Sequence, residues 1–397
     1  MTPSPRGQES SGTAAVFHRE VQRMTSRPLY LLFTLVVPVV TFLLLWAIFS
    51  RGVVQELPVI VCDRDESALS RHLARMIDAT PSMKISRRVG DMAAGRELLM
   101  RREGYALILF PHDLERDVFR GRSPQAVCYY NNQFLVAGSI INRDFHQVVE
   151  TLSTEYAGHS RLIFGEKISG IHAHGEPIDI DSHILFNPQL SYLYFLGSTL
   201  MPSMLQIFVL MMTVFCIGIE LKEGSAGQWL QTAGHNAGKA MAGKLLPYTL
   251  LYLIVGLFMQ ALLFWYLDVP LKGSALMIIL STSLLVLACQ AVGALIVALM
   301  GNLRMSLSSS AFYSLPAFAF SGVSFPFPGM SFLGKAWSLL LPLTYYLELF
   351  VDQSLRGTPE VSSLRPLLLL GLFCVLIVPA TLRLKQLMKD ERHWGLL

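Results

Sequence analysis

The chain carries six apolar stretches, each close to the length of a membrane-spanning helix, and none contains a lysine, arginine, aspartate or glutamate. A helix needs ~20 apolar residues to cross a hydrocarbon core ~30 Å thick, and it satisfies its own backbone hydrogen bonds there. We therefore expect an α-helical membrane protein with six transmembrane helices. The stretches are residues 29–49, 193–219, 245–267, 275–300, 305–323 and 366–382.

Composition agrees with this fold class. The 397 residues are 52% hydrophobic and only 15% charged, which is too apolar for an ordinary soluble chain. The charges are also gathered, because residues 51–192 hold 16 of the 32 basic and 18 of the 28 acidic residues. We expect one water-soluble domain there. The first apolar stretch exceeds the ~7–15 residues of a signal-peptide core, so we expect it to remain as transmembrane helix 1, at 29–50.

Basic residues near the ends of the stretches predict the orientation, since lysine and arginine in short loops stay on the cytoplasmic side. One side carries Arg6, Arg19, Arg23, Arg27, Lys222, Lys239, Lys244, Arg304, Arg383, Lys385, Lys389 and Arg392. The other side carries Lys272, Lys335, Arg356 and Arg365. This asymmetry predicts that both termini are cytoplasmic and that 51–192 is extracytoplasmic.

The 51–192 domain alternates between strand and helix patterns. Strands are predicted at 58–62, 83–89, 105–110 and 126–130, with helices at 67–78 and 91–102. A long amphipathic helix follows at 135–164, then a loop at 165–177 and a strand at 178–186. This order favours an α/β domain with a partly parallel sheet, inserted between transmembrane helices 1 and 2.

The domain offers little sign of an enzyme. Its histidines are His72, His112, His146, His159, His172, His174 and His183. They lack the Cys or carboxylate partners of a zinc site, so we expect no metal. No Gly-x-Ser-x-Gly elbow is present.

Cys62 and Cys128 fall in predicted extracytoplasmic strands, where a disulfide can form if their Cα atoms lie within ~7 Å. The sequence leaves that bond open.

A nucleotide site would let the chain power itself, and its nearest candidate is the segment 234–240, Gly-His-Asn-Ala-Gly-Lys-Ala. The segment is one residue short of a phosphate-binding loop, and Ala240 has no hydroxyl for magnesium. We therefore expect no cofactor in this chain, with ATP and magnesium bound by a partner.

Residues 324–350 combine two proline-rich breaks with Glu348 in an apolar setting, which predicts a re-entrant pair of half helices. Glu348 either lies in headgroup water beside Tyr345 and Tyr346 or belongs to an outer gate.

Three local patterns resemble the permease subunits of ABC-2 type exporters, in the branch with a large extracytoplasmic domain. The first is the segment 61–67, Val-Cys-Asp-Arg-Asp-Glu-Ser, followed by Ser70 and Arg71. The second is 220–225, Glu-Leu-Lys-Glu-Gly-Ser, with Thr232. The third joins Ser321-Gly322 and Phe325-Pro326 to 341–346, Leu-Pro-Leu-Thr-Tyr-Tyr. The chain departs from the family pattern at Leu221, Ser225 and Ala233.

The resemblance implies roles for particular residues. ATPase coupling would involve Glu220, Glu223, Gly224, Trp229 and Leu230, with a coupling helix at 224–237 in which Trp229 and Leu230 are exposed apolar anchors. A re-entrant outer gate at 324–350 would involve Phe325, Pro326, Pro342, Tyr345, Tyr346 and Glu348. The tail, residues 1–28, would form an interfacial elbow helix with Ala14, Phe17, Val21 and Met24 on its apolar face and Arg19, Glu20 and Arg23 opposite.

The resemblance also implies partners and a place. It implies cytosolic ABC ATPase subunits, a second permease subunit that is identical or paralogous, a periplasmic adaptor protein, membrane lipids and no nucleic acid. The location would be the bacterial inner membrane, and the cargo a hydrophobic or amphipathic small molecule or lipid. A membrane-embedded lipid-modifying enzyme and a membrane-anchored sensor remain the alternatives.

Overall fold

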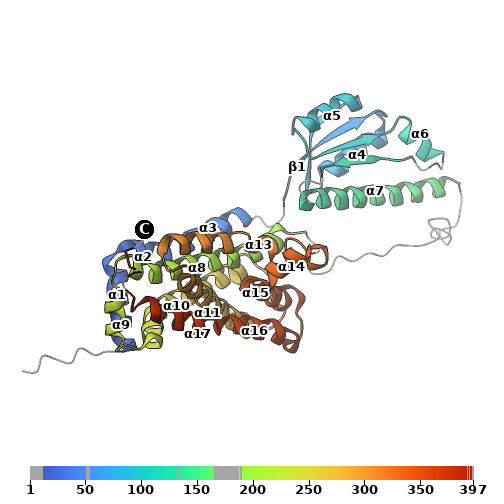
Figure 1. The fold of residues 1–397 in the computed structure, drawn as a ribbon. Helices are drawn as coiled ribbons and strands as arrows, with labels where there is room; N and C mark the ends of the chain where they lie inside the picture. Colours follow the sequence, from blue (N-terminus) through green and yellow to red (C-terminus); the bar gives the residue numbers. More distant parts are fainter. Residues whose placement is uncertain are drawn as a thin grey trace, which may run out of the picture. The chain divides into compact units, whose positions relative to one another are not determined.

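The computed structural model describes residues 12–50, 54–120, 122, 124–131, 135–164, 187, 190–390, 392 and 394–395, with backbone alone at 135 and 157–164. The chain divides into two compact units, which Figure 1 labels by element. Met1–Ser50 and Leu193–Leu397 form the membrane unit, and Arg51–Tyr192 forms the α/β unit. The predicted loop 165–177 and strand 178–186 lie outside the described residues.

A four-stranded sheet forms the centre of the described α/β unit. Its strands are β1 (Leu57–Asp63), β2 (Met83–Val89), β3 (Ala106–Phe110) and β4 (Val127–Tyr130). They lie in the order β2-β1-β3-β4, with β4 antiparallel to β3 and the other neighbours parallel. β1 is apolar at successive positions because both of its faces are covered. The four strands and their partly parallel arrangement agree with the prediction.

Helices cover both faces of this sheet (Figure 1). They are α4 (Ala68–Asp78), α5 (Met92–Met100), α6 (Leu114–Phe119) and α7 (Leu135–Phe164). α4 and α7 pack on the face that presents Val59 and Val61, and α5 packs on the face that presents Ile60 and Leu107. α7 has the predicted bounds, whereas the short helix α6 was not predicted.

The two cysteines of the α/β unit do not meet. Cys62 lies on β1 and Cys128 on β4, with β3 between them. Strands lie ~4.8 Å apart, so two cysteines on strands two apart exceed the ~7 Å Cα limit of a disulfide. The side chains also belong to apolar clusters on opposite faces of the sheet, and both thiols are free. The disulfide that the sequence left open is therefore not formed.

Five helices of the described membrane unit are long and apolar enough to cross a membrane: Pro28–Phe49, Leu193–Lys222, Ala237–Tyr266, Ala275–Met300 and Glu360–Leu387. Their α-helical parts are α2 (Pro28–Leu31), α3 (Val37–Phe49), α8 (Ser198–Lys222), α10 (Ala237–Ala261), α11 (Ala275–Met300), α16 (Glu360–Cys374) and α17 (Ile377–Leu387). Three are extended by π-helical turns, η1 (Leu32–Val36), η3 (Leu193–Gly197) and η4 (Leu262–Tyr266).

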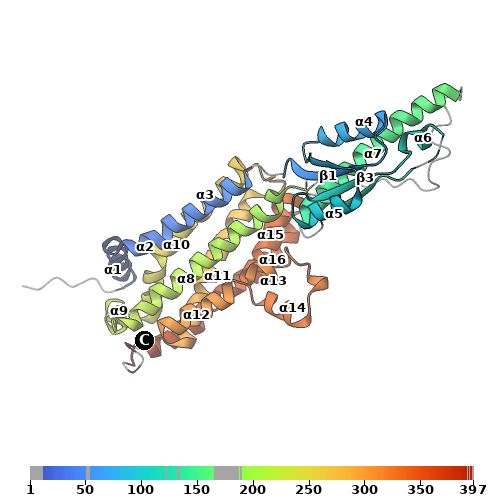
Figure 2. The same ribbon diagram turned by 90° about the horizontal axis from the view of Figure 1, so that it is seen from above.

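The remaining elements are shorter. They are α1 (Thr13–Ser26), α9 (Ala226–Thr232), α12 (Leu303–Ser314), α13 (Ala317–Phe320), η5 (Phe327–Gly329), α14 (Phe332–Leu339), α15 (Pro342–Val351) and η6 (Asp352–Arg356). Figure 2 shows α12 running alongside α8, with which it packs closely.

The predicted span at 305–323 is not one continuous helix. α12 ends at Ser314, and α13 begins only after Pro316. Proline disfavours helical backbone in the residue before it and lacks the N–H that a helix interior needs. The single fifth helix expected from hydropathy is thus replaced by two shorter ones.

The stretch 324–350 does contain a pair of short helices, α14 and α15, joined at Leu340 and Leu341. Ser331 caps the start of α14 by accepting from Gly334 N. Pro342 stands in the first turn of α15, where its missing N–H costs nothing.

The chain leaves and re-enters the membrane unit at neighbouring points. Phe49 ends α3, and a Cβ added at Gly197 in η3 would lie 3.6 Å from its ring. The α/β unit is therefore connected to the membrane unit through two adjacent chain ends.

Candidate functional site

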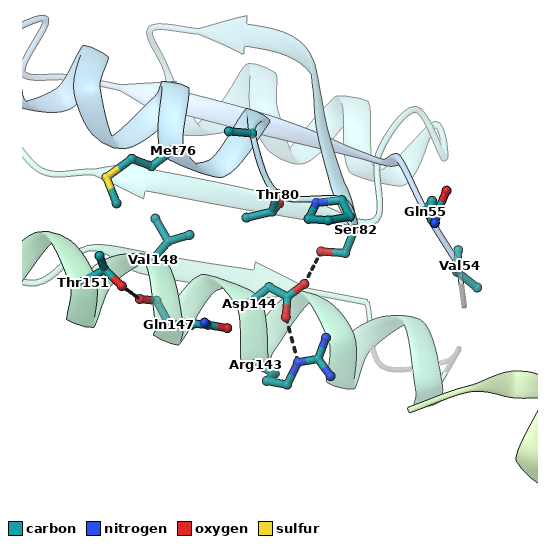
Figure 3. A pocket seen from close by; sticks show the side chains of 12 residues that line it. Val54, Gln55, Met76, Thr80, Ser82, Arg143, Asp144, Gln147, Val148 and Thr151 are labelled. Atoms are coloured by element: carbon teal, nitrogen blue, oxygen red, sulfur yellow. Dashed lines mark hydrogen bonds and ion pairs between the residues drawn. The ribbon is translucent and has the colours of Figure 1, made fainter. Parts of the chain in front are cut away.

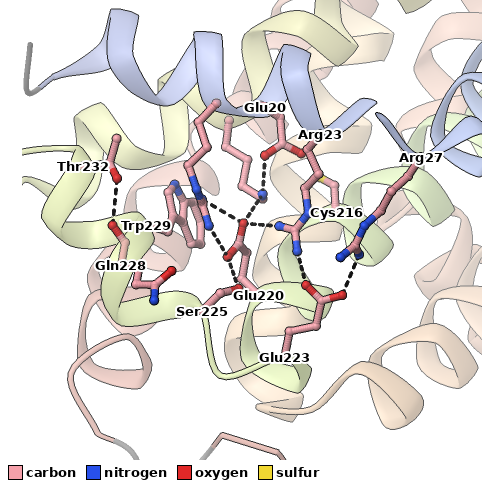
Figure 4. A network of polar contacts seen from close by, with 12 residues as sticks. Glu20, Arg23, Arg27, Cys216, Glu220, Glu223, Ser225, Gln228, Trp229 and Thr232 are labelled. Carbon is pink, nitrogen blue, oxygen red and sulfur yellow. Dashed lines mark hydrogen bonds and ion pairs between the residues drawn. The ribbon is translucent and has the colours of Figure 1, made fainter. Parts of the chain in front are cut away.

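An ionic cluster lies where the C-terminal end of α8 meets α1, α9 and α10 (Figure 4). We call it the α8 hub, and it consists of Arg19, Glu20, Arg23, Arg27, Glu220, Glu223, Ser225, Lys244 and Tyr248. These residues come from segments up to 228 positions apart in sequence.

Glu220 is the central acceptor of the α8 hub. Its fully buried carboxylate accepts from Arg19 Nη1 and Nη2 at 3.0 and 3.1 Å and from Lys244 Nζ at 2.8 Å. Arg23 and the hydroxyl of Ser225 also donate to it. A buried carboxylate is tolerated when its oxygens are paired and hydrogen-bonded. Glu220 therefore holds parts of α1, α9 and α10 around the end of α8.

Lys244 is the buried cation of the same cluster. Its Nζ lies 2.6 Å from Glu20 Oε2 and 2.8 Å from Glu220 Oε1, and 5.1 Å from the ring centroid of Trp229. Tyr248 donates to the other oxygen of Glu20 at 2.7 Å. The lysine is thus neutralised from two helices, α1 and α8.

The rim of the hub is more exposed. Glu223 accepts from Arg27 Nη1 at 2.6 Å and from Arg23. Burial raises the pKa of Glu223, but the hydrogen bond from Arg27 and the charges of Arg23 and Arg27 outweigh this, so its pKa lies below the usual value. The carboxylate therefore stays ionised near neutral pH.

Sequence spacing explains why α1 docks here. Arg19, Arg23 and Arg27 recur every fourth residue and present one row of guanidinium groups to Glu220 and Glu223. On the other flank, a Cβ at Gly243 of α10 would lie 2.6 Å from the Thr13 carbonyl oxygen and 2.7 Å from Val16 Cβ. Only glycine permits so close an approach of the two helices.

The buried face of α1 differs from the predicted one. Val16, Glu20 and Met24 are its buried residues, whereas Ala14 is exposed. Glu20 was expected to face water, yet it is buried because Lys244 and Tyr248 satisfy both of its oxygens. Hydropathy alone ranks a glutamate as a surface residue and cannot anticipate partners on a distant helix.

The predicted coupling segment forms a short helix, α9, after a sharp turn. Gly224 has φ +69°, a left-handed conformation that favours glycine and lets the chain leave α8. The Ser225 N–H donates to the Glu220 carbonyl oxygen at 2.9 Å, which closes the turn.

Trp229 and Leu230 do not form the exposed anchor that the sequence predicts. Trp229 is fully buried, its Nε1 donates to the Ala240 carbonyl oxygen at 3.1 Å, and Leu230 is also buried. They fix α9 to α10 inside the chain, and the exposed side of α9 carries Gln228 and Gln231 instead.

The predicted outer-gate residues are brought together only in part. Tyr346 is buried in α15 and hydrogen-bonded to Thr282 of α11 at 3.1 Å, and Tyr345 donates to the Leu339 carbonyl oxygen at 3.1 Å. Glu348 is exposed and makes no hydrogen bond to a described residue. Phe325 is also exposed, and Pro326 precedes η5.

A second polar site lies in the α/β unit (Figure 3). A cavity of about 910 Å³ between the loop after α4 and the side of α7 includes Ser82, Arg143 and Asp144 in its lining. The Asp144 carboxylate is largely buried, accepts from Arg143 Nε at 2.7 Å and is hydrogen-bonded by Ser82. The acid is therefore neutralised by its own neighbours.

Metal chemistry has no visible support in the described part of the chain, where no three histidine, cysteine or acidic residues come together as ligands. His172, His174 and His183 lie outside the described residues.

Five helices of the described residues are long and apolar enough to cross a membrane, which defines a helical membrane protein. The sequence profile of the ABC-2 family transporter proteins matches residues 28–383, so the chain belongs to that family. It is an integral membrane protein of an ABC transporter, a class of permease that has no ATPase site of its own and works with an ABC ATPase. No curated protein matches the chain in a sequence search.

Proposed function

We propose that the chain is the transmembrane permease subunit of an exporter and that the α8 hub transmits motion from a separate cytosolic ATPase. The main support for this proposal is the position of Glu220. One carboxylate binds the elbow helix α1, the turn into α9 and the helix α10. If α9 moved while α8 and α10 stayed in place, the hydrogen bonds from Ser225 to Glu220 and from Trp229 to Ala240 would break, and leaving buried polar groups unpaired is costly.

The surface for the ATPase is, in this proposal, the exposed side of α9. Gln228 and Gln231 lie there, three residues apart on one face of the helix. Trp229 and Leu230, on the buried side of α9, hold this helix against α10, and Gly224 forms the bend between α8 and α9. The ATPase thus pushes a short polar helix with a rigid apolar backing.

The proposed topology has six crossings, with α12 and α13 together making the fifth. The two helices hold 12 and 4 residues, and 16 helical residues rise ~24 Å, which with the two residues between them approaches the thickness of the hydrocarbon core. An even number of crossings puts both termini on one side, and the basic residues favour the cytoplasm. The α/β unit is then outside, in the periplasm of a bacterium with this chain in its inner membrane.

Release of cargo is proposed to occur beside α15. Pro342 begins this helix, Tyr345 and Tyr346 bind it to α14 and α11, and Glu348 remains exposed on its surface. An exposed carboxylate in an apolar region needs water or a partner, and a second permease subunit, identical or paralogous, would supply one. The proposed cargo is a hydrophobic or amphipathic small molecule or lipid, and an adaptor protein is a further proposed partner of the α/β unit.

The test is coupling to the ATPase that is co-expressed with the chain. The complex is reconstituted in lipid vesicles, and ATP hydrolysis and co-purification of the ATPase are measured for wild type and for the Gln228→Glu, Gln231→Glu double variant. We expect the double variant to lose most of the permease-dependent hydrolysis, because two charges on a polar contact face disrupt docking.

Glu97→Gln is the matched control, because Glu97 forms an exposed ion pair with Arg101 in the α/β unit and α9 belongs to the other unit. Unchanged hydrolysis and co-purification in the double variant would place the docking surface elsewhere. Turnover of a lipid, or ligand-dependent signalling, by the chain without any ATPase would instead favour the enzyme or the sensor.

A further inference from the structure

A lateral cleft on the membrane unit has none of the α8 hub residues in its lining. It has a volume of about 580 Å³ and opens between α10, α11 and α17, three helices that pack against one another. Neither the family assignment nor the proposed transport cycle gives this cleft a role.

The lining of the cleft is apolar apart from a few polar side chains. Met241, Leu245 and Leu246 come from α10, and Val378 and Leu382 come from α17. Among the polar groups, Thr249 and Gln290 are hydrogen-bonded to each other at 2.8 Å, so they leave little unsatisfied polarity inside. The interior therefore suits a hydrocarbon chain better than a polar solute.

The cleft has the depth of one leaflet. Gly238, at one end of the cleft, is the second residue of the span Ala237–Tyr266, and Leu382 lies near the end of the span Glu360–Leu387. The lining continues along α10 to Thr249, eleven residues further, which is a rise of ~16 Å. The cleft thus runs from a membrane–water boundary to about the middle of the ~30 Å core.

Three lysines stand at this boundary. Lys385 follows Val378 by seven residues and Leu382 by three on α17, and Lys389 lies two residues beyond the end of that helix. Lys239 precedes the lining residue Leu246 by seven positions on α10. All three side chains are exposed, and none forms an ion pair with a described residue.

We propose that the cleft binds an anionic glycerophospholipid, with one acyl chain between α10 and α17 and the phosphate at Lys239, Lys385 and Lys389. The three unpaired ammonium groups select a negative headgroup, and each basic residue near a membrane surface adds to the attraction for anionic lipid. A cationic amphiphile would be repelled, and a soluble anion would leave the apolar cleft unfilled.

The bound lipid would act on the coupling apparatus through α10. Gly243, which packs against α1, and the buried Lys244 lie between the lining residues Ala242 and Leu245 on the same helix. Filling the cleft would fix α10 against α17 and so stabilise the arrangement of the α8 hub. This role is independent of the cargo.

The test uses the full chain in a neutral detergent, with the apparent Tm followed as dioleoyl phosphatidylglycerol or dioleoyl phosphatidylcholine is added in mixed micelles. We expect phosphatidylglycerol to raise Tm more than phosphatidylcholine. The triple variant Lys239→Gln, Lys385→Gln, Lys389→Gln should lower the apparent affinity for phosphatidylglycerol at least about tenfold and leave the phosphatidylcholine response unchanged. Lys272→Gln with Lys335→Gln is the matched control and should behave as wild type.

Two further measurements separate chain from headgroup. Ala242→Phe places a ring in the cleft while keeping the lysines, and it should reduce the phosphatidylglycerol response. Glycerol 3-phosphate alone should give no stabilisation. Equal responses of wild type to the two lipids, a retained preference in the triple variant, an unchanged response in Ala242→Phe, or stabilisation by glycerol 3-phosphate alone would each overturn the proposal.

A measurement of lipid retention by the wild-type protein tests the proposal even if the variants do not fold. Native mass spectrometry after delipidation should show phosphatidylglycerol retained selectively over phosphatidylcholine. Equal loss of the two lipids would count against the site.

Discussion

Replacing Lys244 with methionine removes the buried cation of the α8 hub at nearly constant length. Glu220 keeps Arg19 and Arg23, but Glu20, whose side chain is 1% exposed, keeps only the hydroxyl of Tyr248. Removing one partner of a buried ion pair typically costs ~3–5 kcal/mol, because the remaining charge is left uncompensated. We therefore expect Lys244→Met to be strongly destabilising, with Glu20 as the main cause.

The second variant isolates that cause. Glu20→Gln combined with Lys244→Met removes the charge that the single variant leaves behind, so the double variant should be more stable than Lys244→Met alone by ~2 kcal/mol or more. In thermal unfolding followed by tryptophan fluorescence in detergent, ~2–4 °C per kcal/mol predicts a Tm loss of at least ~6 °C for Lys244→Met and partial recovery for the double variant. Lys335→Met, at an exposed position, should change stability by no more than ~0.5 kcal/mol. A double variant that is no more stable than Lys244→Met would refute the assignment of the cost to Glu20.

Four other outcomes test separate parts of the structure. Gly243→Leu should displace α1 and make it sensitive to protease, because a Cβ there lies 2.6 Å from a backbone oxygen, whereas Gly371→Leu, with open space around it, should not. Trp229→Ala should lower the free energy of unfolding by ~3–5 kcal/mol. Trp229→Phe should lower it far less, because phenylalanine keeps most of the packing and loses one hydrogen bond of ~1 kcal/mol. Equal losses of stability in the two variants would show that packing does not hold α9. Cys62 and Cys128 should both be alkylated after unfolding without reductant. Burial raises the pKa of Cys128 to about 12, so at pH 8 this thiol in the folded protein should be alkylated roughly three orders of magnitude more slowly than an ordinary thiol, and the rate should increase as the pH rises. Glu348→Ala should reduce ATP-dependent transport more than Glu348→Gln if hydrogen bonding by Glu348 holds the gate closed. Transport at the wild-type rate by the alanine variant would exclude the gate and support the other interpretation, in which Glu348 lies in headgroup water.

Local pattern was sufficient for much of the α/β unit. β1 and β3 are short apolar runs between turn residues, and α7 repeats apolar residues at helical spacing over its whole length, so their predicted bounds agree with the structure. α6 was missed because its six residues are too few to show a period. Whether Cys62 and Cys128 could form a disulfide depended on strand order, which no local pattern contains.

The α8 hub was only partly predictable. Glu220 and Glu223 were identified, but through resemblance, and Lys244 was used only as an orientation signal. Glu20 and Lys244 are buried because they meet each other across 224 residues, a fact of tertiary structure. Trp229 shows the converse error, since an aromatic residue on a short polar helix suggested a partner surface and its actual partner is α10 of the same chain.

The adjacency of Phe49 and Gly197 makes the α/β unit an exchangeable module. Because the chain departs and returns at nearly the same point, a short glycine- and serine-rich linker can replace the whole unit without stretching the helices on either side. Lengthening or shortening such a connection changes the closure entropy only slowly. The α/β unit can therefore be exchanged or removed while the helices of the membrane unit keep their connections.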